Sequence, residues 1–371
     1  RVSPHGAGLA NAVLHRVAEE DLPALVHARE RVESRNCTAS DIALVAALPQ
    51  WLADELVVSL GTEGACRMAL SALDAPGVYV AGNACMHNDA EVDRLLSAAG
   101  LIPRATCLPG CLSLSSAAGL SASGLVDAVD VVPADMAAQV VAWLASPTPG
   151  TRMLEVGQGR GTKSLLLESY ALRRGGLAHI AAVESEAFKV TVSRARMERA
   201  GLCKAVTCTA LDGRRLGEKD LLPELSGSFD SAFVDAPCSG TGTMRRHPEI
   251  AWALQEPAVR PTGQSLPTLQ LELLRAVSTR VGAGGTLAYA TCSELREEDE
   301  GVVAAFLAGP EGAPFSLVNP RSTAAFVALP PQAKRLVTAM VGPDGMVRTS
   351  RVDAPELPLD GHFLALLVRE A

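Results

Sequence analysis

The chain has 371 residues, of which 48% are hydrophobic and 20% charged, and its formal net charge is −8. This length predicts two or three domains with an ordinary buried core, and the lack of a run of about 18 apolar residues predicts no membrane-spanning helix. The acidic total argues against a surface coated in cations for unspecific nucleic-acid binding, although it leaves room for a local basic groove. The first residue is Arg1, so a preceding targeting segment is not excluded.

The first 150 residues are predicted to hold helices and one short strand. Helices are expected at Ala7–Val17, Pro23–Val32, Ala39–Ala47 (behind a Thr38 or Ser40 cap), Trp51–Leu60, Thr62–Leu73 and Asp89–Ala99, and a strand at Val78–Ala81. Residues 1–48 therefore form a helical segment and residues 49–145 a small α+β domain. The turn-rich Pro147–Gly150 follows as a seam.

Residues 146–371 are predicted to form one α/β domain, because strands and helices alternate along them. Strands are expected at Met153–Val156, Ile180–Val183, Ala205–Leu211, Ser231–Val234, Thr286–Thr291 and His362–Val368. Helices are expected at Lys163–Leu172, Ala187–Ala200, Leu269–Val281 and Glu297–Leu307. Such alternation predicts a mostly parallel sheet with helices on both faces, which binds ligands at the carboxyl ends of its strands.

Three acidic residues at the ends of successive strands predict a nucleoside site. The first strand runs into the glycine-rich segment Glu155-Val-Gly157-Gln-Gly159-Arg-Gly161, whose backbone can approach a ligand closely. Glu184 closes the second strand and is placed to bind ribose hydroxyls; Asp212 follows the third strand, where it can receive an adenine amino group. Each acid alone is as readily a helix cap or turn residue. NAD is the rival ligand, but nothing downstream resembles a hydride-transfer site.

Two cysteines at neighbouring strand ends indicate chemistry at the same edge of the sheet. The fourth strand ends in Asp235-Ala-Pro-Cys238, followed by a loop of small residues that leads to Arg245 and Arg246. The next strand ends in Thr291-Cys292-Ser293. A cysteine at a strand end is most often a small buried hydrophobe, but a pair beside a nucleoside site favours a reactive role.

The chain has nine cysteines at irregular spacing, which is typical of a reduced, intracellular protein. Cys107 and Cys111 lack a second pair at metal-site spacing, so no zinc site is expected. Further arginine pairs occur upstream of Arg245, and these are as readily solvated helix faces as a nucleic-acid surface.

The segment Asp235–Glu249 and the Thr-Cys-Ser motif followed by Glu297-Glu298-Asp299-Glu300 resemble the RsmB/Nop2/Sun family of RNA cytosine-5 methyltransferases. The resemblance extends over the whole chain and is strongest to the RsmB-type 16S ribosomal RNA enzymes. It implies a Rossmann-like class I methyltransferase sheet over residues 146–371, a small RNA-binding domain over 49–145, and a remnant of a NusB-like domain over 1–48.

The resemblance also implies the cofactor and the roles of the site residues. S-adenosylmethionine would be bound by the glycine-rich segment with Lys163, the acids at the strand ends and Asp235. Cys292 would attack C6 of the cytosine, Asp235 would hold or protonate N3, and Cys238 would act in product release. Arg245 and Arg246 would contact phosphates of the RNA, and a cytoplasmic monomer without metal or membrane contact is expected.

Of three departures from the family pattern, two bear directly on the binding of cofactor and RNA. The family's Cys-Ala-Ala-Pro-Gly-Gly-Lys-Thr is replaced by Gly157-Gln-Gly-Arg-Gly-Thr-Lys163-Ser164, which puts the cofactor affinity in question. The family's Leu-Arg-Val-Asn is replaced by Val80-Ala-Gly-Asn83, which removes an arginine from the small domain. The altered first motif and the acidic charge leave open an RNA-binding assembly protein that has lost activity. A DNA cytosine methyltransferase that uses Cys238 as its nucleophile is a further alternative.

Overall fold

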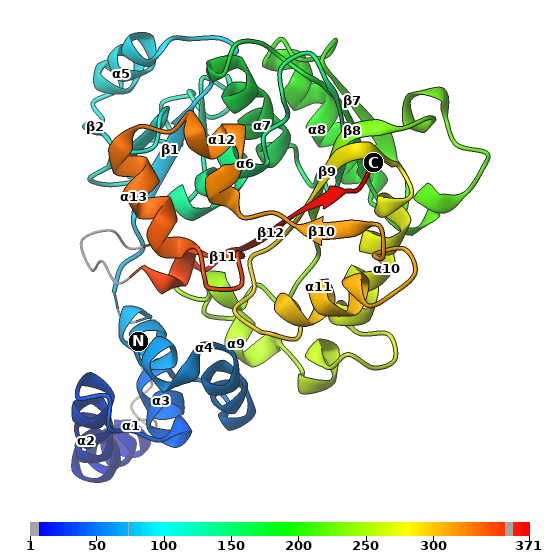
Figure 1. The fold of residues 1–371 in the computed structure, drawn as a ribbon. Helices are drawn as coiled ribbons and strands as arrows, with labels where there is room; N and C mark the ends of the chain where they lie inside the picture. The colour runs from blue at the N-terminus through cyan, green and yellow to red at the C-terminus, as the bar shows by residue number, and fades with distance from the viewer. Residues whose placement is uncertain (1–6, 73, 353–358) are drawn as a thin grey trace. The chain divides into compact units, whose positions relative to one another are not determined.

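The computed structural model describes residues 7–72, 74–352 and 359–371 of the chain. Its internal contacts form two compact units, one of Arg1–Ala75 with Met244–Glu256 and one of Pro76–Thr243 with Pro257–Ala371. All strands of the described residues belong to the second unit (Figure 1).

The first unit is helical, as predicted. Its elements are α1 (Ala7–Arg16), the π-helical stretch η2 (Val17–Asp21), α2 (Leu22–Glu33), α3 (Ala39–Ala46), α4 (Gln50–Ser71) and α9 (Ile250–Ala253). Thr38 caps α3 in a reciprocal pair with Asp41, which confirms one of the two predicted caps.

Helix α4 corresponds to the two helices that were predicted before and after Gly61. That glycine has a non-helical backbone (φ 69°, ψ 165°) and breaks α4 into two halves. The predicted end of the second half, Leu73, lies outside the described residues. No single helix in the described part of the chain is long and apolar enough to cross a membrane, although α3 and α4 pass that test as a pair bent by 115°.

The second unit contains a small antiparallel sheet that the sequence analysis found only in part. Its strands, in spatial order, are β2 (Pro103–Ala105), β3 (Cys111–Leu114), β1 (Val78–Gly82) and β4 (Val131–Pro133), with helix α5 (Asp89–Ala98) beside them. The predictions for β1 and α5 are confirmed within one residue. The other three strands have only three or four residues each, which is too short for a periodic pattern to be visible.

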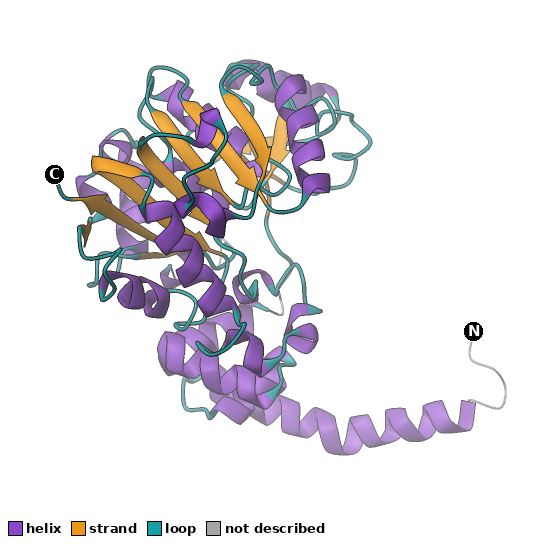
Figure 2. Cartoon of the chain, turned by 90° about the vertical axis from the view of Figure 1, so that its right-hand side faces the viewer, coloured by secondary structure: helices purple, strands orange, loops and turns teal. Residues whose placement is uncertain are grey.

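The large sheet confirms the predicted α/β architecture. Its main path is β10 (Phe315–Leu317), β12 (Phe363–Arg369), β9 (Val281–Thr291), β8 (Phe229–Asp235), β5 (Arg152–Val156), β6 (His179–Glu184) and β7 (Val206–Ala210), and β11 (Val347–Arg348) pairs with β12. The five strands from β9 to β7 are parallel to one another, whereas β12 is antiparallel to β9. Figure 2 shows the strands as a layer between helices.

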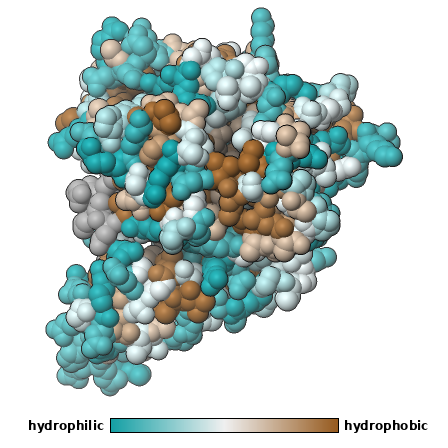
Figure 3. All heavy atoms as spheres, viewed as in Figure 1, coloured by the Kyte–Doolittle hydropathy of each residue, from teal (hydrophilic) through white to brown (hydrophobic). Residues whose placement is uncertain are grey.

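Helices cover both faces of this sheet. One face packs on α6 (Met136–Ala145), α7 (Thr162–Arg173), α8 (Ala187–Arg199), α12 (Ala324–Val327) and α13 (Pro331–Met340), and the other on α10 (Leu266–Ser278) and α11 (Glu300–Leu307). Strand residues alternate between the two cores, as Ile180 and Ala181 do. Figure 3 shows apolar atoms gathered on the outer side over β10 and β12.

Helix α6, which the sequence analysis did not predict, joins the small sheet to the large one. Its residues are almost wholly buried, and its Trp143 shares one apolar cluster with Tyr79 of β1 and Leu364 of β12. The apolar core therefore continues across the predicted domain boundary between residues 145 and 146. The division into a helical segment (1–48), a small domain (49–145) and a catalytic domain (146–371) stays a prediction.

Two predicted helix bounds around the site are wrong. The helix expected to reach Val281 ends at Ser278, because Val281 already pairs with Phe229 in the sheet. The helix expected from Glu297 begins at Glu300. The side chains of Glu298 and Asp299 are fully buried and hydrogen-bonded away from the helix, so the chain does not begin a helical turn there.

A buried arginine fastens the loop after β9 to the C-terminal strands. Arg348 on β11 is 3% exposed and lies 3.0 Å from Glu294, 2.9 Å from Asp299 and 2.7 Å from Glu300. Burial raises the pKa of Glu294 and of Asp299, and the positive charge of Arg348 opposes both shifts. The arginine therefore compensates acids that otherwise favour the protonated form in the folded chain.

Replacing Arg348 with Met is expected to lower the free energy of unfolding by about 3–5 kcal/mol at pH 7, because it leaves buried carboxylates without a cation. Carboxyls with raised pKa values are neutralised as the pH falls, so the loss is expected to be smaller at pH 5. Urea unfolding followed by circular dichroism measures both values, with the exposed Arg335→Met as the matched control. A variant as stable as the wild type at pH 7 contradicts this role.

Candidate active site

The site lies where the order of the parallel strands reverses. From β5 the chain proceeds outward to β6 and β7, and it then returns to β8 and β9 on the other side of β5. The carboxyl ends of β5 and β8 therefore lie at the point of reversal, which is where sheets of this type bind ligands. The glycine-rich segment follows β5, and the segment with Asp235 and Cys238 follows β8.

The glycine-rich segment packs too closely on its surroundings for side chains. Gly157 has φ +82°, and a Cβ atom on it would lie 2.1 Å from the backbone oxygen of Asp235. Gly161 has φ +80°, and its Cβ atom would lie 2.8 Å from Ser193 Oγ on α8. Around Gly159, by contrast, a Cβ atom would meet nothing within 4 Å. This segment thus presents bare backbone toward open space, as close binding of a nucleoside group requires.

Glu184 is tied to this segment at the end of β6. Its Oε2 atom accepts a hydrogen bond from Gly159 N at 2.8 Å, and its Oε1 atom accepts one from Glu186 N at 3.0 Å. The residue is only 7% exposed. Its carboxylate is therefore held in one orientation beside the open backbone of Gly159.

Glu155 lies behind the glycine-rich segment rather than in front of it. It is fully buried, and its Oε2 atom accepts a hydrogen bond from Ser164 Oγ at 2.6 Å. Burial raises the pKa of Glu155 to about 8. Ser164 also receives a hydrogen bond from Gln158 Nε2 at 3.0 Å, so these three side chains brace the segment from inside.

Asp212 follows β7, as predicted, and is paired with an arginine. It lies 2.6 Å from Arg214 Nη2 and also accepts a hydrogen bond from the backbone nitrogen of Arg214 at 3.0 Å. The hydrogen bond from the Arg214 side chain lowers the pKa of Asp212. Three carboxyl groups thus lie at the ends of three neighbouring parallel strands, and that of Glu184 accepts a hydrogen bond from the backbone of the glycine-rich segment.

The structure brings Cys238 and Cys292 into contact. Their sulfur atoms are 3.3 Å apart, and the backbone nitrogen of Cys292 lies 3.3 Å from Cys238 Sγ. Both residues are partly exposed. The parallel pairing of β8 with β9 sets Asp235 opposite Ala290, so the two strands deliver their cysteines to one place.

The pKa values of the two cysteines shift in opposite directions, and Lys163 contributes to this difference. Its Nζ atom lies 2.6 Å from Asp235 Oδ2, in an ion pair that is largely shielded from solvent. The hydrogen bond from the Cys238 thiol lowers the pKa of Cys292, burial opposes that effect, and the positive charge of Lys163 reinforces it. The same hydrogen bond and burial raise the pKa of Cys238. These opposite shifts make Cys292, and not Cys238, the thiol of the pair that ionises first.

The structure does not place two of the predicted site residues relative to the cysteines. Arg245 and Arg246 belong to the first unit, where both are partly buried. The sequence analysis missed Gln158 and Ser164 as supports of the glycine-rich segment, because polar residues in such a loop have no distinctive pattern. Glu298 lies within an acidic run, and nothing in that run indicates a separate role for it.

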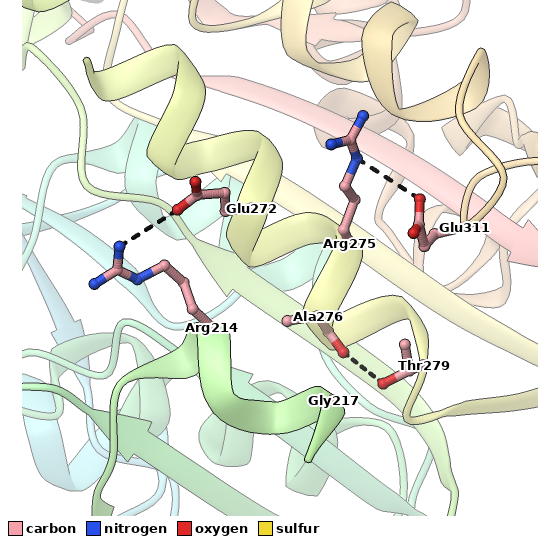
Figure 4. A pocket seen from close by; sticks show the side chains of 7 residues that line it. All are labelled: Arg214, Gly217, Glu272, Arg275, Ala276, Thr279 and Glu311. Atoms are coloured by element: carbon pink, nitrogen blue, oxygen red, sulfur yellow. Dashed lines mark hydrogen bonds and ion pairs between the residues drawn. The ribbon is translucent and has the colours of Figure 1, made fainter. Parts of the chain in front are cut away.

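A hollow of about 400 Å³ lies between α10 and the segment that follows β7, and its lining includes Arg214, the partner of Asp212 (Figure 4). Its charged side chains pair with one another: Arg214 lies 3.4 Å from Glu272, and Arg275 lies 3.7 Å from Glu311. Because these charges are mutually balanced on an open surface, the hollow offers little to a charged ligand.

Comparison with known protein families identifies a match to the description "16S rRNA methyltransferase RsmB/F" over residues 142–330. Among curated proteins, the chain is 32% identical over 314 residues to ribosomal RNA small subunit methyltransferase B of Pseudomonas putida, covering 84% of this chain and 66% of that protein. It is 29% identical to the protein of the same name from Xylella fastidiosa, covering 82% and 65%. The chain thus spans about two thirds of the length of these relatives.

Solved structures show the same fold at lower sequence identity. One is NSun6 from Pyrococcus horikoshii with SFG, with a TM-score of 0.68 and 16% identity over 88% of this chain and 100% of that chain. Another is a methyltransferase homologue from the same organism, with a TM-score of 0.66 and 19% identity over 89% and 98%.

Replacing Lys163 with Met is expected to shift the alkylation of Cys292 by iodoacetamide to higher pH by about one unit, because the thiolate loses a nearby cation. The rate at each pH is measured by mass spectrometry of the peptide that contains Cys292. Lys189→Met, which removes a partly exposed lysine paired with Glu186, is the matched control. An unchanged pH profile in the Lys163 variant argues against this electrostatic role.

Proposed function

Because the chain belongs to the RsmB/F family of 16S rRNA methyltransferases, we propose that it transfers a methyl group from S-adenosylmethionine to C5 of a cytosine in RNA, with 16S ribosomal RNA as its substrate. The observation that carries the proposal is the 3.3 Å contact between the sulfur atoms of Cys238 and Cys292 at the strand-order reversal. The names of the curated relatives support the choice of ribosomal RNA.

We assign the nucleoside part of the cofactor to the residues at the strand ends. Glu184 would accept hydrogen bonds from the ribose hydroxyls and Asp212 would receive the adenine amino group, and the open backbone at Gly159, to which Glu184 is hydrogen-bonded, supports this assignment. Glu155 acts from behind, by holding the glycine-rich segment through Ser164. When bound, S-adenosylmethionine supplies an electrophilic methyl group.

Cys292 is the nucleophile in this proposal. C5 of cytosine is a poor nucleophile, and addition of a thiolate to C6 converts the ring into an enamine whose C5 attacks the methyl group. The lowered pKa of Cys292, caused by the Cys238 hydrogen bond and by Lys163, increases the thiolate fraction that this step needs.

Asp235 and Cys238 complete the reaction. Asp235, whose charge is balanced by Lys163 at 2.6 Å, holds or protonates N3 and so stabilises the charge that develops on the ring. Once C5 carries the methyl group, a base accepts the C5 proton, the C6–sulfur bond breaks, and Cys292 departs as the thiolate. We assign Cys238 to this release step, and its 3.3 Å contact with Cys292 Sγ supports the assignment.

Two cysteines favour RNA over DNA as the substrate. A DNA enzyme with this chemistry needs one cysteine, at the position that Cys238 occupies after Pro237, and would have no use for Cys292. The target base must leave its stack, which costs a few kcal/mol and is easiest in single strands and loops. We assign the phosphates next to that base to Arg245 and Arg246, and further RNA contacts to residues 49–145 and to the helical segment 1–48.

A second candidate function is RNA binding without catalysis. The altered glycine-rich segment favours it, because it lacks the proline and the paired glycines that are usual in the family. Transfer of a tritiated methyl group to ribosomal RNA separates the two functions. No incorporation at a saturating cofactor concentration favours the binding protein.

Replacing Cys292 with Ala is expected to abolish methyl transfer, because the adduct at C6 cannot form. Replacing Cys238 with Ala is expected to trap the adduct, since the later elimination fails while the attack does not. Denaturing gels with labelled RNA detect the trapped complex, and Cys203→Ala, which removes an exposed cysteine, is the control. Normal turnover in the Cys292 variant would show that the nucleophile is assigned wrongly.

Replacing Glu184 with Ala is expected to weaken cofactor binding by about 10- to 100-fold, because the ribose loses a charged acceptor and the glycine-rich segment loses its anchor. Calorimetric titration with S-adenosylmethionine measures the affinity. The matched control is Glu186→Ala, which removes an exposed acid two residues further on. Equal affinities for the two variants would remove Glu184 from the cofactor site.

A further inference from the structure

Glu298 connects the loops that carry the two cysteines, although neither the family match nor the proposed reaction assigns it a role. It is fully buried in the turn before α11. Its Oε1 atom accepts hydrogen bonds from Ser239 N at 2.9 Å and from Gln270 Nε2 at 3.0 Å. Its Oε2 atom accepts a hydrogen bond from Ser293 Oγ at 2.6 Å.

These contacts bracket both cysteines. Ser239 directly follows Cys238, and Ser293 directly follows Cys292. Gln270 also donates to the backbone oxygen of Pro237 at 2.9 Å, so the residues before and after Cys238 are held by one connected group. One carboxylate thus restrains the ends of β8 and β9, where a shift of about 1 Å is enough to cost two orders of magnitude in rate.

Ser293 forms further hydrogen bonds that join the loop after Cys292 to the loop after Cys238. Its Oγ atom lies 3.2 Å from Ser239 Oγ and 3.3 Å from Thr241 Oγ1, and it accepts a hydrogen bond from Leu295 N at 2.9 Å. Among the described residues no salt bridge joins Glu298, whereas Arg348 pairs with the nearby acids Glu294, Asp299 and Glu300. The position of Glu298 is therefore set by hydrogen bonds from the two cysteine loops and from Gln270.

We propose that Glu298 is the positioning residue that holds Cys238 and Cys292 in reactive contact and keeps a negative charge behind them. The proposal rests on the roles assigned to the two cysteines above.

The charge of Glu298 acts on both thiols. The hydrogen bond between the thiols lowers the pKa of Cys292, and Glu298 and Asp235 oppose this lowering while Lys163 adds to it. The same hydrogen bond and burial raise the pKa of Cys238, and Glu298 raises it further. The groups that face the pair are thus Lys163 on α7, Asp235 on β8 and Glu298 before α11.

The test compares Glu298→Gln with Glu298→Ala in the whole chain. The amide of Gln can accept from Ser239 N and donate to Ser293 Oγ, so it keeps the geometry and removes the charge. We expect Glu298→Gln to keep methyl transfer within about tenfold of wild type and to shift iodoacetamide alkylation of Cys292 to lower pH. We expect Glu298→Ala to lower kcat by about 100-fold with little change in KM for the cofactor. The neighbouring Glu297→Gln is the matched control.

Site-resolved alkylation keeps this test separate from the proposed function, because it needs no RNA and no methyl transfer. If the wild type does not methylate RNA, the pH profiles still decide whether Glu298 acts on the thiols. Profiles of Cys238 and Cys292 that are the same in wild type and Glu298→Gln overturn the charge role. Full activity of a folded Glu298→Ala variant overturns the positioning role.

Discussion

The contact between the sulfur atoms of Cys238 and Cys292 is the interaction on which the rest of the site depends. It follows from the register of two parallel strands. Because Asp235 of β8 pairs with Ala290 of β9, the two strands end next to each other, and the cysteines that follow them lie side by side. The strand-order reversal next to β8 then brings the glycine-rich segment, and with it the proposed cofactor, to the same edge of the sheet.

Several acidic side chains lie near the two thiols, and cations of the surrounding structure balance their charges. Lys163 balances Asp235 at 2.6 Å in front of the pair, and Arg348 balances the acids of the loop behind Cys292. Buried ion pairs of this kind contribute little net stability, because desolvation offsets their attraction. These ion pairs instead fix the orientation of the loops, because a charged hydrogen bond is directional and an apolar contact is not. The site thus combines rigid strands with loops that are held by charged hydrogen bonds.

The sequence predicted the parts of this structure that depend on local pattern. The structure confirms the mostly parallel sheet that the alternating apolar runs predict, and the glycine-rich segment and the two cysteine motifs follow its strands. The sequence did not reveal what depends on distant partners. Helix α11 was expected to begin at Glu297, because nothing in the sequence shows that Glu298 turns inward to Ser239, 59 residues earlier. Helix α6 was missed because it is apolar on all sides, and β2, β3 and β4 because they are too short for a period to emerge.

The central claim is that Cys292, and not Cys238, forms the bond to the base. It is tested most directly with RNA that carries 5-fluorocytosine, because fluorine at C5 cannot leave as the proton does and the adduct persists after methyl transfer. Proteolysis and mass spectrometry of the complex formed with S-adenosylmethionine identify the modified peptide. The account predicts a nucleotide with an added methyl group on the peptide that contains Cys292. A nucleotide on the peptide that contains Cys238 would contradict it.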